Sequence, residues 1–463
     1  MVEKALSQQK EASIFTIADF RRALYVRFNQ PTMFWALMAM ILSYFYNLSV
    51  FNYSLLGTNE LRLYDFAGLI LFYYYFNNFK YTQHFIHTQP FFRSLYQFLM
   101  YCLITLVFTM FFSILSQKFL YFFSGILYLY HFYTFFLTAV YMSILMRNAK
   151  NLKTFVTTSL VISSIAFSIV LLQNMGILPF LWNDLYRDTY DAFLSGTFGP
   201  NKIVLGMSAL MMSILSIALI NTRSVTINKV YIYINLGLAL LTLALSGSRT
   251  AYVGLGVFVF YFAVRRPTSL IYSAAGMAAF LLFVLIVQPQ IIQKTIEVYE
   301  KRVEKKISSE EDLRDANVTR LYEDMGAGRN ILLVRYLDLL ADEYYFIPLG
   351  RGFNNRIDTS SSAHNMYLSL IYEVGLVGMV LYFRWLVLYL FVRMRRLKVM
   401  ETALHGLILS MIITLFFGEH LYVYRALFGL VGLFLFVVTV LTSPLFLVEE
   451  TSKENVSTEE EPR

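Results

Sequence analysis

The sequence has little charge and almost no cysteine. Only 15% of its 463 residues are charged, whereas soluble globular domains carry about 25%. Hydrophobic residues make up 57% and aromatic residues 17%, which is more apolar surface than a soluble interior can bury. Cys102 is the single cysteine, so no internal disulfide can form. These features exclude a soluble enzyme, a disordered protein and a disulfide scaffold, and they favour a protein that lies in a lipid bilayer.

Motifs of cofactor and metal chemistry are also missing. The sequence contains no Walker-type phosphate loop, no Cys/His or carboxylate cluster with metal-ligand spacing, and no DxD-type carboxylate pair. Gly350-Arg351-Gly352 is too short to be identified as a phosphate-binding loop. We therefore expect neither a metal nor a cofactor. The formal net charge of +8 favours positively charged cytoplasmic loops over nucleic-acid binding.

Twelve apolar runs reach or approach the length of about 17 to 25 residues that crosses a bilayer as a helix. They extend over about 32–51, 63–77, 95–115, 119–145, 154–173, 202–220, 230–247, 250–264, 268–288, 365–391, 401–418 and 422–447. This pattern predicts an all-α polytopic membrane protein with about twelve transmembrane helices.

The distribution of Lys and Arg predicts the orientation of these helices. With the N-terminus in the cytoplasm, 20 Lys and Arg residues lie in inner segments and 6 in short outer loops or helix ends, as the positive-inside rule requires. The expected order is a cytoplasmic segment (1–30), nine transmembrane helices (31–288), an extracytoplasmic loop (289–364), three more helices (365–447) and a cytoplasmic acidic tail (448–463). Each half of the long loop is typical of a charged amphipathic helix, and the tail has the composition of a disordered segment.

Charged side chains near a bilayer are candidates for function, because they are costly there unless they are paired or hydrated. Arg249 lies in SGSRT at the outer turn between the seventh and eighth runs, where Gly247 and Ser248 permit a tight turn. A guanidinium group binds phosphate through two parallel hydrogen bonds. The alternative is an arginine that only contacts lipid head groups at the interface.

Two other outer elements could also meet an anion at a helix N-terminus. The turn SGTFGPN precedes the sixth run, where Asn201 would cap the helix and Lys202 follows. The alternative is an ordinary capping turn. Gly328-Arg329-Asn330 opens the second amphipathic helix of the long loop, although an arginine placed there for solubility explains Arg329 equally well.

The fourth element begins where the long loop re-enters the membrane. His364 could take a proton from a hydroxyl near neutral pH, and Asn365 could orient it or cap the following helix. The alternative for His364 is an interfacial hydrogen-bonding residue. Glu373 lies about two turns deeper in an apolar run and needs a partner, which favours a structural role. Three residues of the next outer turn are further candidates for the same site: Glu419, His420 and Arg425.

Together these elements resemble the O-antigen ligase and Wzy-type polysaccharide polymerase superfamily over about residues 195–380. The shared order is an FGPN-type turn before a helix, SGSR at an outer turn, a long outer loop with an arginine opening a helix, then PLGRGF and HNMYLSLIYEVGLVG. The resemblance implies an all-helical GT-C-like membrane fold. It also implies transfer of a glycan from undecaprenyl pyrophosphate to an acceptor hydroxyl on the outer face of the membrane, without a metal.

The resemblance further implies roles for individual residues. Arg249 and, from the long loop, Arg329 would bind the pyrophosphate, and His364 would activate the acceptor. Nearby alternatives to Arg329 are Arg320, Arg335, Arg351 and Arg356. The expected substrate-binding positions around these catalytic residues are Asn201, Lys202, Ser248, Arg351, Asn365, Glu419, His420 and Arg425.

Three functional interpretations follow. A polymerase joins repeat units to one another. The abundance of Phe, Tyr, Asn, Ile and Lys fits an AT-rich genome of a Gram-positive bacterium that makes capsule or exopolysaccharide. Such a cell has no lipopolysaccharide acceptor, so a polymerase is favoured over a ligase. A transporter or lipid-glycan flippase should show two related halves, often separated by a long inner loop, whereas the connection NTRSVTINK is short. The expected location is a bacterial cytoplasmic membrane with both termini inside. The expected partners are the lipid-linked glycan, membrane lipid, a flippase and a chain-length regulator.

Overall fold

The computed structural model describes most of the predicted helical regions. The described residues are 17–47, 49–52, 60–179, 181, 196–199, 202–222, 227–269, 271, 273–275, 278, 282, 293, 329–358, 363–422 and 429–443. The first predicted helix of the long loop and most of the run at 268–288 lie outside these residues.

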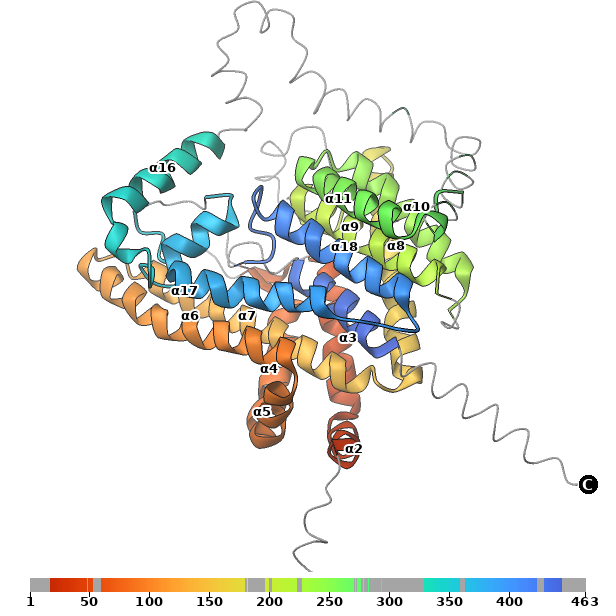
Figure 1. The fold of residues 1–463 in the computed structure, drawn as a ribbon, viewed down its shortest axis with the longest axis horizontal. Helices are drawn as coiled ribbons and strands as arrows, with labels where there is room; N and C mark the ends of the chain where they lie inside the picture. The colour runs from red at the N-terminus through yellow and green to blue at the C-terminus, as the bar shows by residue number, and fades with distance from the viewer. Residues whose placement is uncertain are drawn as a thin grey trace, which may run out of the picture.

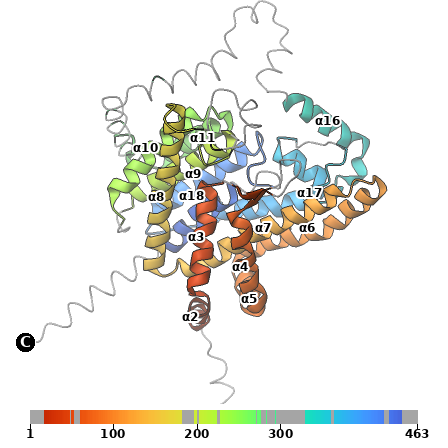
Figure 2. The same cartoon turned by 180° about the vertical axis from the view of Figure 1, so that it is seen from behind.

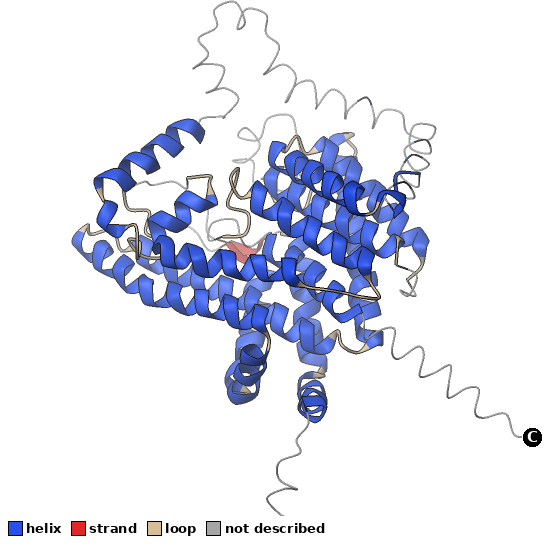
Figure 3. Ribbon diagram, in the orientation of Figure 1, coloured by secondary structure: helices blue, strands red, loops and turns tan. Residues whose placement is uncertain are grey.

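Helices dominate the described residues, as the apolar runs predict (Figure 3). The first half of the chain contains α2 (Ile17–Phe28), α3 (Pro31–Phe45), α4 (Leu63–Asn77), α5 (Phe79–Thr88), α6 (Pro90–Leu115), α7 (Leu120–Leu145), α8 (Ala149–Asn174), α9 (Lys202–Ile220), α10 (Lys229–Leu245) and α11 (Arg249–Arg265). The second half contains α16 (Arg329–Asp342), η3 (Tyr344–Phe346), α17 (Met366–Leu388), η4 (Tyr389–Phe391), α18 (Lys398–Thr414) and the helix Gly429–Ser443.

The helices form two adjacent groups (Figure 1). In one group α6 contacts both α7 and α17, and α4 contacts α3 and α7. In the other group α9 contacts α10, α11 and α18, and α8 packs on α10. Contacts between α3 and α8, seen from behind in Figure 2, connect the two groups. Because every residue of α9 from Ile203 to Ile220 is buried, α9 is the core helix of its group.

The surface of α6 shows why its sequence has no polar face. Leu95, Leu99 and Leu106 are buried at helical spacing, while Val107 and Phe111 are each 56% exposed. A helix that is apolar on both its packed and its exposed side is typical of a membrane span. The exposed apolar side would face lipid.

Five described helices are long and apolar enough to cross a membrane. They are Pro90–Leu115, Leu120–Leu145, Ala149–Asn174, Lys202–Ile220 and Met366–Phe391. Three shorter apolar helices are Pro31–Phe45, Lys229–Leu245 and Gly429–Ser443. The structure therefore agrees with an all-α membrane protein, and the number of twelve spans and the orientation stay predictions.

The helix predicted over residues 32–51 is shorter in the structure. The helix α3 ends at Phe45, and β1 (Ser49–Asn52) then pairs antiparallel with β2 (Glu60–Arg62) in the two-stranded sheet of Figure 3. The backbone N–H of Asn47 donates to the Thr197 carbonyl oxygen at 2.8 Å instead of continuing the helix. A tertiary contact therefore ends a helix that the hydrophobic pattern alone would continue.

Candidate functional site

The turn between α10 and α11 places Arg249 at the first position of a helix. Gly247 adopts a positive φ of 58°, and the Ser248 hydroxyl caps α11 by accepting from the Ala251 N–H at 3.4 Å. Ser248 is buried and Arg249 is partly buried. A Cβ added to Gly206 of α9 would lie 2.8 Å from the Ser248 Cβ, so the turn packs directly on α9.

The described residues of the turn before α9, 196–199, pack against α8. Gly196 and Gly199 both have positive φ, and the Gly196 N–H donates to the Gln173 side chain of α8 at 2.9 Å. The Phe198 ring stacks on Phe167 with centroids 5.4 Å apart. Lys202 then begins α9 as an exposed residue. Two of the predicted anion-binding elements, this turn and the α10–α11 turn, thus both lie next to the N-terminal part of α9.

The N-terminal end of α17 is hydrogen-bonded to the residue that follows α18. The Asn365 side chain caps α17 by accepting from the N–H groups of Tyr367 and Leu368 at 3.0 and 3.3 Å, which is one of the two roles expected for it. The Met366 N–H donates to the Leu415 carbonyl oxygen at 2.9 Å. His364 precedes the cap with a positive φ of 52°, a conformation that is uncommon outside glycine.

The end of α18 also contacts α11. A Cβ added to Gly254 of α11 would lie 3.1 Å from the Thr414 side chain, and Gly254 follows Arg249 by little more than one helical turn. Leu415, the next residue of the chain, bonds to the start of α17. Arg249 and His364 therefore lie at helix starts that share the C-terminal end of α18 as a neighbour.

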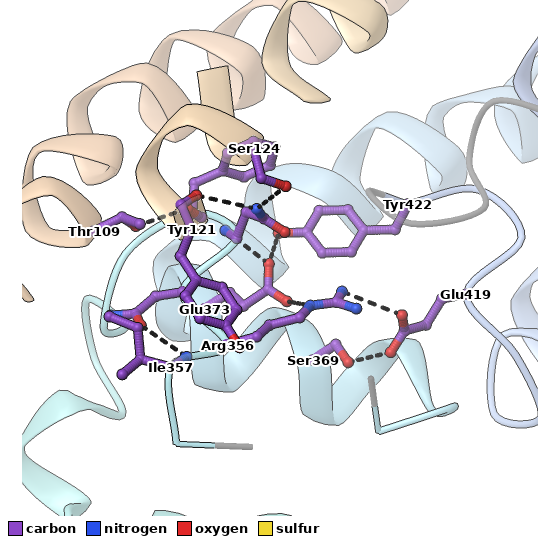
Figure 4. Close-up of polar contacts among 12 residues, drawn as sticks. Thr109, Tyr121, Ser124, Arg356, Ile357, Ser369, Glu373, Glu419 and Tyr422 are labelled. Atoms are coloured by element: carbon purple, nitrogen blue, oxygen red, sulfur yellow. Dashed lines mark hydrogen bonds and ion pairs between the residues drawn. The ribbon is translucent and has the colours of Figure 1, made fainter. Parts of the chain in front are cut away.

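A buried ion cluster connects the loop before α17 with α17 and with the turn after α18 (Figure 4). Arg356 Nε donates to Glu373 Oε1 at 2.9 Å, and its Nη2 donates to Glu419 Oε2 at 3.3 Å. The side chains of Glu373 and Glu419 are 0% and 2% exposed. Arg356 comes from the loop before α17, Glu373 from α17, and Glu419 from the turn after α18 (Figure 4). The cluster thus joins three segments that are distant in sequence.

Neutral donors satisfy the remaining carboxylate oxygens. Glu373 Oε2 accepts from the Tyr422 hydroxyl at 3.1 Å and from the Asn354 N–H at 3.0 Å. The Ser369 hydroxyl donates to Glu419. Burial alone would lower the pKa of Arg356, but the adjacent carboxylates raise its pKa above the ordinary value. Because two carboxylates face one guanidinium, these hydrogen bonds stabilise the excess negative charge.

The sequence PLGRGF inserts into a break in α17. Gly375 has a φ of 69°, outside helical geometry. The Leu376 N–H donates to the Ile347 carbonyl oxygen at 2.9 Å, and the Gly352 N–H donates to the Glu373 carbonyl oxygen at 2.8 Å. A broken helix inside a membrane protein must have its backbone groups satisfied by other protein segments. The 347–352 segment supplies those partners.

Two facing glycines make this insertion possible. A Cβ on Gly375 would lie 2.5 Å from the Gly350 nitrogen, and a Cβ on Gly350 would lie 2.4 Å from the Glu373 carbonyl oxygen. No Cβ fits at such a distance from backbone atoms. The glycines of PLGRGF and EVGLVG therefore hold the loop against the helix.

The Arg351 guanidinium group contacts carboxylates, a phenol and an aromatic ring of the protein. Its Nη1 contacts Glu343 at 2.9 Å, the Tyr372 hydroxyl at 3.0 Å, and Asp358. Its guanidinium carbon lies 4.8 Å from the centre of the Phe112 ring. Burial opposes its charge, but the neighbouring phenol and carboxylates raise its pKa. A role in substrate binding stays a prediction for Arg351, and it requires the substrate to compete with these contacts.

His420 is buried as a neutral imidazole. Burial lowers its pKa to about 3, and its Nε2 lies 3.2 Å from the Thr414 hydroxyl. That hydroxyl also donates to the Met411 carbonyl oxygen at 3.1 Å, which assigns the proton to Nε2. Nδ1 is then an acceptor with no hydrogen-bond partner among the described residues.

A comparison with protein families assigns the segment that contains this site. Residues 234–383 match the family model described as O-antigen ligase. This segment of the chain is similar to the O-antigen ligase family. The match supports the family resemblance predicted from the motifs, and it supports glycan transfer of the ligase or polymerase type. No curated protein matches the chain significantly.

The O-antigen ligase segment runs from α10 into α17, so it includes Ser248, Arg249, Arg351, His364 and Asn365. Lys202, at the start of α9, and Glu419 and His420, in the turn after α18, lie outside the segment. Arg329 is the first residue of α16, and its side chain lies outside the described residues. Asn201 and Arg425 are also outside the described part of the chain. The roles of all these residues stay predictions.

The sequence analysis did not predict the buried ion cluster. Glu373 was expected to need a partner, and the structure supplies Arg356, which the sequence indicates only as one of four alternatives to Arg329. Nothing in the sequence pattern singles out Tyr422 or Ser369. The usable signal is an acidic residue inside an apolar run, because it requires a cation somewhere on the same side of the bilayer.

Proposed function

We propose that this protein is a polysaccharide polymerase. It transfers a growing glycan from undecaprenyl pyrophosphate to a hydroxyl of another lipid-linked repeat unit, on the outer face of a bacterial cytoplasmic membrane. Arg249 and Arg329 bind the pyrophosphate, and His364 accepts the proton of the attacking hydroxyl. The reaction requires no metal, because the two guanidinium groups stabilise the leaving group.

The chemistry of the reaction explains these roles. When the glycosidic bond breaks, its electron pair goes to the pyrophosphate oxygen, where negative charge develops. Positive groups already fixed at that position lower the barrier. The acceptor oxygen forms the new bond to C1 as His364 removes its proton. A single displacement with no enzyme nucleophile inverts the configuration at C1.

One observation carries the proposal. Arg249 and His364 begin or precede helices that both contact the same end of α18, through Gly254–Thr414 and Met366–Leu415. Lys202 and the described residues 196–199 lie on the same side, because α9 packs on the Arg249 turn through Gly206. A cation, an imidazole and a helix N-terminus at one end of a membrane bundle suit a lipid-linked phosphate substrate.

A ligase is the second candidate function, and the description of the matched family favours it. A ligase would use the same pyrophosphate site but would transfer a finished glycan to a different lipid or protein acceptor. Composition is the argument for a polymerase, since it fits a cell that has no lipopolysaccharide acceptor. A lipid-glycan transporter remains the third interpretation.

The deciding experiment uses purified protein, a synthetic undecaprenyl-pyrophosphate repeat unit and gel analysis of the products. A ladder of lengthening products identifies a polymerase, and Arg249→Ala and His364→Ala should each abolish it. Gly256→Ala is a matched control, because a Cβ at Gly256 meets nothing within 4 Å. Intact substrate without a ladder argues against a polymerase, and product formed only after adding a candidate acceptor identifies a ligase. Inactivation by EDTA that a divalent ion reverses would contradict the metal-independent reaction.

A further inference from the structure

A cavity of about 620 Å³ lies at the end of the bundle that faces away from the candidate site. It is lined by the start of α6 (Phe91), the end of α7 (Ser143) and the end of the last helix (Thr442). The ion-cluster loop contacts the opposite ends of α6 and α7, where Thr109 donates to the Phe353 carbonyl oxygen. The cavity is therefore separate from the glycan-transfer site.

The walls of this cavity are apolar and well fixed. Phe91 stacks on Tyr389 with centroids 4.7 Å apart and nearly parallel planes. The Tyr389 hydroxyl accepts from the Trp385 indole N–H at 3.0 Å. Phe85 and Phe434 are each only 1% exposed and line the same space. Such walls favour a hydrocarbon chain over water.

The rim of the cavity is basic. Arg22 of α2 is exposed, and Arg147, which follows α7, is partly buried. The Arg147 guanidinium carbon lies 5.3 Å from the centre of the Phe85 ring, so the cation lies against the apolar wall. Gln89 and Asn148 are further polar lining residues, and no Asp or Glu is among the lining residues that the structure describes. An occupant would meet two positive charges at one end and aromatic side chains at the other.

We propose that this cavity binds one anionic phospholipid, with its phosphate at Arg22 and Arg147 and an acyl chain along the Phe91 and Phe434 wall. Basic pockets between transmembrane helices on the cytoplasmic side are a known basis for recognition of anionic lipid head groups. The predicted orientation places this end of the bundle in the cytoplasmic leaflet. A free phosphate ion would satisfy only the rim, and a zwitterionic lipid would supply no net negative charge.

The test is native mass spectrometry of the full chain in mild detergent, with phosphatidylglycerol and phosphatidylcholine of identical acyl chains at equal concentration. We expect one bound phosphatidylglycerol. Each arginine near a lipid surface contributes roughly fivefold to affinity, so Arg22→Gln/Arg147→Gln should weaken binding about 25-fold. The control Lys150→Gln/Lys153→Gln removes two exposed charges from the start of α8, outside the cavity, and should leave binding unchanged.

A second variant tests the apolar wall without changing charge. Ser143 lines the cavity from α7, and Ser143→Phe should reduce phosphatidylglycerol binding by filling the space of the acyl chain. Equal binding of both lipids, or equal weakening by the lysine control, would overturn the proposal. Complete displacement of the lipid by inorganic phosphate would also overturn it, because the cavity would then recognise the phosphate alone. The outcome does not depend on whether the protein is a polymerase or a ligase.

Discussion

Removal of Arg356 should release the loop before α17 from the bundle. The variant Arg356→Met keeps an unbranched side chain as far as the position of Nε, but it removes the guanidinium group and leaves Glu373 and Glu419 buried without their cation. Breaking a buried ion pair by removing one partner costs about 3–5 kcal/mol. The protein can avoid this cost by protonating one carboxylate. For an ordinary glutamate with a pKa of about 4.3, that protonation costs about 3.7 kcal/mol at pH 7.

The cost should therefore be about 3–4 kcal/mol at pH 7 and should decrease by about 1.4 kcal/mol for each pH unit below it. Ile357 is 7% exposed, next to Arg356, so a cysteine at this position reports the opening of the loop. The natural Cys102 is buried and is replaced by alanine in every sample. In the Arg356→Met background, Ile357→Cys should react with a methanethiosulfonate reagent about 500-fold faster at pH 7 and about 50-fold faster at pH 6.

Two further variants test whether the unpaired buried carboxylates cause the faster labelling. Arg335 is exposed and donates to the Asp358 carbonyl oxygen at 2.6 Å, so Arg335→Met removes a nearby surface contact worth at most about 1 kcal/mol and should change labelling less than about tenfold. Glu373→Gln in the Arg356→Met background mimics the protonated carboxylate and should restore most of the protection. Equal labelling with and without Arg356 would refute the reasoning, and a rate increase that is independent of pH would show that buried carboxylates are not its source.

Four other predictions test separate parts of the molecule. Gly375 has a φ of 69° and a ψ of −177°, a conformation that glycine almost alone adopts, and its Cβ would meet the 347–352 loop. Gly375→Ala should therefore destabilise the purified protein by at least about 1–3 kcal/mol, whereas Gly256→Ala should not. Equal thermal denaturation of the two variants would contradict this. His420 has a pKa near 3 when folded and about 6.5 when unfolded, so only the unfolded chain gains the proton between these values. Stability should thus fall by about 2 kcal/mol from pH 6.5 to pH 5, and His420→Gln should remove that dependence in thermal denaturation curves. Arg249→Lys should lower the rate of glycan transfer roughly 10- to 150-fold, the effect expected when the transition state loses one charge-assisted hydrogen bond. Full activity of this variant would exclude bidentate binding. A cysteine at the exposed Tyr345 should react with an impermeant reagent in intact cells, and its protection there would reverse the predicted orientation.

The positions of most described helices follow from the sequence. The predicted runs at 63–77 and 202–220 have the same bounds as α4 and α9, because apolar length and the polar residues at the ends determine a membrane helix with little help from its neighbours. Asn365 also caps α17 as its position suggests. Local sequence is sufficient where local interactions decide the structure.

Local sequence is not sufficient where distant segments exchange partners. The α3 helix ends at Phe45 because Asn47 bonds to Thr197, a residue far along the chain. The break at Gly375 is stable because the 347–352 segment satisfies the free backbone groups. A hydrophobicity pattern contains neither fact, since it records the solvent that a segment prefers and not the partner that it finds.

The motif PLGRGF shows how this distinction affects the assignment of function. Arg351 stands between two glycines, an arrangement that suggests phosphate binding. In the structure, however, the glycines pack against the backbone of α17, and Arg351 contacts two carboxylates. The loop is then held again, a few residues later, by Arg356 in the buried cluster. These contacts fix residues 347–358, which precede His364 in the chain, relative to α17 and the turn after α18. A reaction that needs a base within hydrogen-bond distance of the acceptor hydroxyl depends on that fixed position. We therefore expect Gly350, Gly375 and Arg356 to affect glycan transfer through the placement of His364, and Arg249 to affect it through the pyrophosphate.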